Sequence, residues 1–249
     1  MTDVRTPDRP PTVPGPPTPD RRAGAEPPRR WWRRPWVVPL AALVVLFVGF
    51  SVPPYLTLDP ARSRIEPPDG AVLYHPLLVA HVLFASVAIL TCWLQVWPWF
   101  RRRYPAVHRR AGRLYVFAGV LPAGLAGLYL GAVTPFGPVA RASNLVMATL
   151  WLACTVTGWR RARQRRYAEH RRWMVRSFVL TLSIITNRIW GVALFLLLSP
   201  QLETTFHGDE KLLTWTIAGA GTWLGWTLPL LAAQWWLDRT PRRPVSARR

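Results

Sequence analysis

The chain has 249 residues, half of them hydrophobic, and a formal net charge of +20 at pH 7. In a soluble protein this charge would suggest a nucleic-acid partner. Here the arginines stand beside long apolar runs, so membrane topology explains them better, and we expect no nucleic-acid partner.

The apolar residues gather in six runs, most of them about 20 residues or more, the length that an α-helix needs to cross the hydrocarbon core. We therefore predict an all-α integral membrane bundle, a single domain over residues 35–237. Its six predicted transmembrane helices cover residues 36–55, 74–98, 113–133, 142–159, 173–198 and 213–237. Residues 1–34 are rich in proline and arginine and lack a core, so we expect disorder there. Residues 238–249 form a basic tail.

Basic residues set the predicted orientation of the helices. Of the 32 Lys and Arg residues, 27 lie in the N-terminal segment, the 101–113 and 160–176 loops and the tail, and the three opposite loops hold only four. Short loops rich in Lys and Arg remain cytoplasmic. We therefore predict cytoplasmic N- and C-termini, in a multi-pass protein of the bacterial inner membrane.

Two basic clusters precede predicted helices, one beginning at His108 and the other at His170. Arginines at this depth commonly bind anionic headgroups. We expect this anchoring role for eight of them: Arg101, Arg102, Arg103, Arg109, Arg110, Arg171, Arg172 and Arg176. Anchoring explains the arginines but not the histidine that begins each cluster.

Arg188 stands inside the fifth predicted helix, where a charge costs about 2.5 kcal/mol or more unless it is paired or hydrated. It marks a cavity, a partner or a bound anion, or it is a structural arginine satisfied by carbonyl groups, Asn187 and water. His81 reaches a similar depth on an antiparallel helix, so the two are expected to line one site. His170 lies five helical turns from Arg188 on the same face.

Small and polar residues recur three or four positions apart along several predicted helices, which is typical of close helix packing. Gln95 ends one such face on the second helix. Cys92 and Cys154 form no metal motif and are interpreted as small core residues. The candidate ligand or cofactor residues, as a hypothesis, are therefore His81, Gln95, His108, His170, Asn187 and Arg188, with no metal site.

In four places the chain resembles the bacterial membrane protein family called domain of unknown function 2306. These are the region of His75, His81 and Gln95, the clusters beginning at His108 and His170, and Asn187-Arg188. The resemblance extends over about residues 73–198. It implies a multi-helix integral membrane protein and brings no established activity.

Four classes of function stay open. The first is a non-catalytic membrane or lipid-interacting protein that binds anionic lipids of the bilayer. The second is a redox protein that binds haem b through histidine imidazoles. The third is a transporter or channel component, suggested by the twin basic loops. The sequence contains no nucleophile triad, P-loop or acidic metal motif, so we assign no catalytic residue, and an enzyme of lipid chemistry also stays open.

Overall fold

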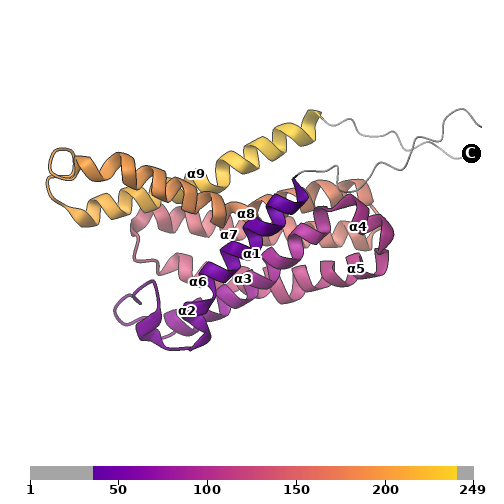
Figure 1. The fold of residues 1–249 in the computed structure, drawn as a ribbon, viewed down its shortest axis with the longest axis horizontal. Coiled ribbons are helices and arrows are strands. Elements are labelled where there is room, and N and C mark those ends of the chain that lie inside the picture. The colour runs from indigo at the N-terminus through magenta and orange to yellow at the C-terminus, as the bar shows by residue number, and fades with distance from the viewer. Residues whose placement is uncertain (1–35, 240–249) are drawn as a thin grey trace, which may run out of the picture. The chain divides into compact units, whose positions relative to one another are not determined.

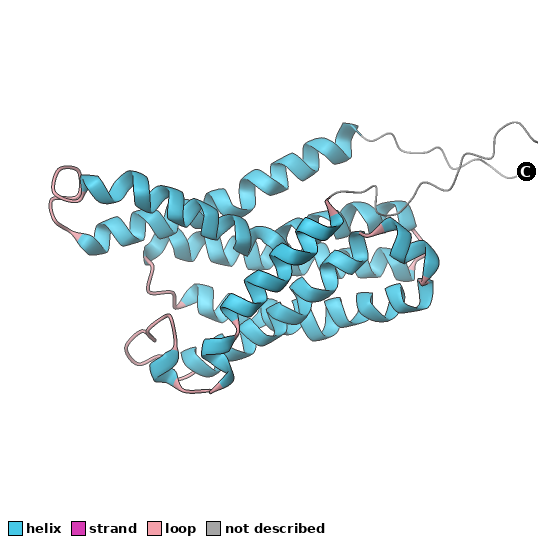
Figure 2. Ribbon diagram, in the orientation of Figure 1, coloured by secondary structure: helices cyan, strands magenta, loops and turns pink. Residues whose placement is uncertain are grey.

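The computed structural model describes residues 36–239, and within this range every regular element is a helix (Figure 2). The all-α prediction is therefore confirmed. The predicted disordered segment 1–34 and most of the predicted tail lie outside the described residues. The elements are α1 Val37–Ser51, α2 Pro53–Leu56, η2 Pro60–Arg62, α3 Tyr74–Val96, α4 Pro98–Arg103, α5 Pro105–Arg113, η3 Leu114–Val120, α6 Leu121–Ala132, α7 Gly137–Arg163, α8 Tyr167–Leu198, η4 Ser199–Gln201 and α9 Glu210–Arg239.

Four helical segments are long and apolar enough to cross a membrane: Tyr74–Val96, Pro105–Ala132, Gly137–Arg163 and Tyr167–Gln201. Helix α1 has only 15 residues, although α2 continues it after a one-residue break. Helix α9 has 30 residues, but glycines, threonines and a charged first turn dilute its apolar character. The described chain thus contains several membrane-capable helices, and the count of six stays a prediction.

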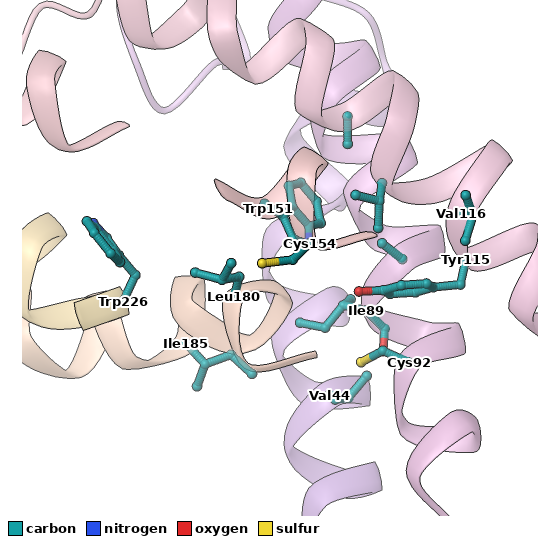
Figure 3. Packing of buried hydrophobic residues seen from close by; sticks show 13 residues of the cluster. Val44, Ile89, Cys92, Tyr115, Val116, Trp151, Cys154, Leu180, Ile185 and Trp226 are labelled. Carbon is teal, nitrogen blue, oxygen red and sulfur yellow. The ribbon is translucent and has the colours of Figure 1, made fainter. Parts of the chain in front are cut away.

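The larger of two core clusters draws residues from α1, α3, η3, α6, α7, α8 and α9 (Figure 3). Val44, Ala88, Tyr115, Val120 and Ala123 are almost completely buried in it. In Figure 1, α3 and the α5–η3–α6 segment lie alongside each other, and α8 and α9 form a long hairpin. Part of the small-residue face of α3, at Ala88 and Cys92, thus lies in this core.

Glycines allow the closest helix approaches, as their spacing predicts. A Cβ atom at Gly119 would lie 2.9 Å from Cα of Ala88, so only glycine lets η3 approach α3 this closely. A Cβ atom at Gly225 would lie 2.9 Å from Cα of Asn187, so α8 and α9 are in backbone contact there.

A π-helix, η3, joins α5 to α6. π-helices are rare and often occur at functional sites, because the extra residue turns the side chains that follow it. Pro122 stands two residues later, at the start of α6, and removes one backbone donor from this turn. The π-helix begins one residue before Tyr115, whose side chain is 1% exposed and points into the core (Figure 3). Tyr115 therefore lies at the start of the π-helix, with its side chain in the core.

Candidate functional site

His170, near the start of α8, is fixed by a hydrogen bond to the neighbouring helix. Its Nδ1–H donates to the carbonyl oxygen of Gly158 on α7 at 2.8 Å. A Cβ atom at Gly158 would lie 2.6 Å from Sδ of Met174, so α7 and α8 are very close here. Because Nδ1 carries the proton, Nε2 of the neutral ring is the nitrogen left to accept a hydrogen bond or bind a ligand.

His108 lies at the corresponding position on α5 and is half-buried. The Gln95 side chain donates a long hydrogen bond of 3.4 Å to the backbone carbonyl of His108. Nδ1 of His108 is buried and has no hydrogen-bond partner among residues 36–239. The ring lies within electrostatic range of Arg101, Arg109 and the imidazole of His170. The structure therefore brings together the two histidines that the sequence places at matched positions.

Seven residues after each histidine, the two helices are joined by a buried hydrogen bond. The Tyr115 hydroxyl lies 2.5 Å from Oγ of Ser177 and 2.7 Å from Oγ1 of Thr181. Oγ1 of Thr155 lies 2.6 Å from Oγ of Ser177, and the Trp151 indole donates to Thr181. We call these five residues, Tyr115, Trp151, Thr155, Ser177 and Thr181, the hydroxyl network.

Every donor of the hydroxyl network has an acceptor, which a buried polar group requires. The Thr181 hydroxyl also lies 2.9 Å from the backbone carbonyl of Ser177, and the Thr155 hydroxyl 2.7 Å from that of Trp151. All five residues are at most 6% exposed. The network therefore ties η3, α7 and α8 together without leaving an open ligand position.

Arginines from α4, α5 and α8 gather near the two histidines. The pKa of Arg101 is lowered, first by burial of its guanidinium group and then by the positive charges of Arg171 and Arg102. The side chain as a whole is nevertheless exposed. Among the eight predicted anchoring arginines, six have neither a carboxylate nor a hydrogen-bond partner in the described part of the chain: Arg101, Arg102, Arg103, Arg109, Arg110 and Arg171. Arg103 and Arg171 lie over the aromatic rings of Tyr104 and Trp236. We call these six arginines the unpaired arginine cluster.

The other two predicted anchoring arginines bind within the protein instead. Arg172 donates to the carbonyl of Leu237 at 2.7 Å and forms an ion pair with Asp238 at 2.9 Å. Arg176 donates twice to the Gln234 side chain. These contacts join the start of α8 to the end of α9, so both arginines have a structural role that the sequence pattern does not distinguish from anchoring.

The only acidic residue of the 160–176 loop, Glu169, is already paired with arginines of that loop. Glu169 forms ion pairs with Arg161, at 3.1 Å, and with Arg166. It therefore leaves the unpaired arginine cluster uncompensated, and this surface is suited to an anion from outside the chain.

A shallow hollow adjoins the cluster along α5 and η3. It is lined by Arg110 and Arg113 at one end and by Leu114, Phe117 and Ala118 beyond them. The Phe117 ring packs edge-on against Trp159 of α7 at 5.4 Å. Two cations followed by an apolar strip would suit a molecule with an anionic head and a hydrocarbon chain.

That His81 and Arg188 line one site stays a prediction. Nδ1 of His81 donates to the carbonyl of Ala123 at 2.8 Å, and the ring packs against Gly127 of α6. Arg188 is exposed and has no hydrogen-bond or ion-pair partner among the described residues. Asn187 points to α9, where it contacts Gly221 and Gly225. No interaction between His81 and Arg188 is found within residues 36–239.

Sequence reasoning missed three members of the hydroxyl network: Tyr115, Trp151 and Thr155. Ser177 and Thr181 belong to the small and polar residues that recur four positions apart along the fifth predicted helix. The spacing of four between Trp151 and Thr155, which matches that of Ser177 and Thr181, was a signal for a facing helix. Nothing in the sequence predicts the π-helix in which Tyr115 lies.

No three His, Cys, Asp or Glu side chains gather as a metal-binding group in the described range. In comparisons with known proteins, the family model of DUF2306, described as a predicted membrane protein, matches residues 78–236. No curated protein and no solved structure matches the chain.

Proposed function

Because the chain belongs to the DUF2306 family of predicted membrane proteins, we propose that it is a six-span protein of the bacterial inner membrane that binds anionic lipids on its cytoplasmic side. The unpaired arginine cluster would hold the headgroup. Arg172 and Arg176 would serve the packing of α8 on α9.

The observation that carries this proposal is the convergence of like charges without an acid. Arg101 and Arg171 come from different helices and lie close enough for their charges to repel. Like charges held together are unfavourable unless an anion compensates them, and a phosphate group accepts hydrogen bonds from two guanidinium groups at once. An anionic headgroup at the membrane surface is the most abundant anion at that depth.

The hollow beside the cluster supports a lipid rather than a free anion. Leu114 and Phe117 are 52% and 50% exposed, and they continue from Arg110 and Arg113 along one helix face. A headgroup on the arginines would let its acyl chain lie along these side chains, because arginines at the interface and apolar residues below them match the two parts of a phospholipid.

Lipid mass spectrometry of the purified protein tests the proposal. We expect phosphatidylglycerol or cardiolipin to co-purify with the wild type and to decrease in the variant Arg101→Gln/Arg171→Gln. The matched control is Arg62→Gln/Arg64→Gln, which removes the same charge from the opposite loop. Equal retention of anionic lipid by the two double variants would contradict the proposal.

A second candidate function, haem b binding by His108 and His170, rests on their nitrogen atoms. Nε2 of His170 is free to act as a ligand because Nδ1 donates to Gly158, an orientation common among metal-binding histidines. Nδ1 of His108 has no partner in the described range. An absorption spectrum after haem supplementation tests this function. A Soret band lost in His170→Ala supports it, and a spectrum without such a band rejects it.

A further inference from the structure

One face of α8 is buried in its first half and uncovered in its second. Ser177 and Thr181 lie on this face and contact the hydroxyl network. Ile184, Arg188, Val192 and Phe195 continue the same face at helical spacing. All four are exposed, Val192 by 61% and Phe195 by 55%. The packing face thus extends beyond the helices that cover it.

Arg188 is the only charged residue of α8 after Arg176. It lies about 15 Å before the end of the helix at Leu198, by helical rise. Its guanidinium group finds no acceptor within residues 36–239. Charged side chains inside membrane helices nearly always pair with an acceptor. The acceptor for Arg188 must therefore come from outside this part of the chain.

We propose that the exposed face Ile184–Arg188–Val192–Phe195 docks a transmembrane helix of a partner protein that carries a carboxylate at the depth of Arg188. The apolar residues on either side would pack against the partner helix. The carboxylate would accept hydrogen bonds from both nitrogen atoms of the guanidinium fork. A partner helix without a carboxylate would leave the positive charge of Arg188 unpaired.

A second copy of this chain is a poorer occupant. The segments Tyr74–Val96, Pro105–Ala132 and Gly137–Arg163 contain no Asp or Glu. In α8 and α9 the acidic residues lie only near the ends, at Glu169, Glu210 and Asp238. A second copy could not bring a carboxylate from the middle of one of these helices to Arg188.

Association with designed peptides in proteoliposomes tests this surface. The full chain carries a donor fluorophore, and the probe is a leucine-rich transmembrane peptide with one central Glu and an acceptor fluorophore. Matched peptides carry Gln or Leu at the centre. We expect the Glu peptide to bind roughly three- to tenfold more tightly than the Leu peptide, given the strength of polar contacts between membrane helices. Arg188→Leu should abolish this preference.

Two control variants separate a docking face from simple charge attraction. Arg141→Leu removes an exposed arginine from α7 and should keep the preference for Glu. The exchange Arg188→Ile/Ile189→Arg preserves composition but turns the charge about 100° around the helix, and it should lose the preference. A preference for the Glu peptide that survives the exchange or Arg188→Leu would overturn the proposal. So would equal binding of all three peptides, or energy transfer between copies of the chain that depends on Arg188.

Discussion

Tyr115 and Ser177 meet through their hydroxyl groups, whose oxygen atoms lie 2.5 Å apart although 62 residues separate them in the chain. Each stands seven residues after the histidine of a basic cluster. The bond therefore fixes the two clusters relative to each other, because α5–η3 and α8 both run away from them. The position of the unpaired arginine cluster depends on this buried contact.

Replacing Tyr115 with Phe should destabilise the protein by about 1 kcal/mol, a typical value for a buried hydrogen bond. The cost is moderate because Ser177 keeps Thr155, and Thr181 keeps Trp151, as partners. Unfolding in a detergent or urea titration measures it. Tyr129→Phe is the control, because Tyr129 has no hydrogen bond in the described structure. Equal stability of the two variants would show that the network adds nothing.

Replacing Gly225 with Ala should separate α8 from α9. The added Cβ atom would lie 2.9 Å from Cα of Asn187, and backbone atoms cannot move aside as a flexible side chain can. We expect a loss of about 1–3 kcal/mol, as for other overpacked positions. Gly191→Ala is the matched control, since its Cβ atom would meet nothing within 4 Å. If thermal unfolding ranks the two variants in the opposite order, the packing account of this helix pair is wrong.

The predicted orientation can be checked by labelling single cysteines in intact cells. With Cys92 and Cys154 replaced by Ala, we expect Gln164→Cys to be protected from a membrane-impermeant maleimide and Glu203→Cys to react. The two positions lie in the turns at opposite ends of α8. Lysis should make Gln164→Cys reactive, which controls for burial. The reverse pattern would place the arginines on the outer side and refute the proposed topology.

The sequence was sufficient for the helical class, for the approximate helix positions and for the glycine contacts. These features can be predicted because apolar runs and the regular spacing of small residues are visible in the order of residues along one helix. Helix ends were less accurate. The third helical segment begins at Pro105 rather than near residue 113, and α7 begins at Gly137 rather than residue 142. Proline is compatible with the first turn of a helix, so Pro105 and Pro138 start these helices instead of preceding them.

The candidate site was only partly predictable, because its contacts depend on which way each helix face turns. Arg172 and Arg176 look like their neighbours in the sequence, yet they donate hydrogen bonds to α9, whereas Arg171 only lies over the Trp236 ring there, 5.3 Å from its centroid. Arg188 and His81 share a depth by residue counting, but no interaction joins them in the described range. Residue spacing gives depth and face within one helix, whereas the choice of neighbouring helix is decided by tertiary packing.

A lipid titration followed by native mass spectrometry tests the central claim most directly. The full chain is titrated with phosphatidylglycerol and with phosphatidylcholine of the same acyl composition. We predict tighter binding of phosphatidylglycerol, with a loss of about 1 kcal/mol for each arginine removed from the pair Arg101 and Arg171. Arg62→Gln/Arg64→Gln should bind as the wild type does. Equal affinity of the wild type for the two lipids, or a preference unchanged in Arg101→Gln/Arg171→Gln, would contradict the account.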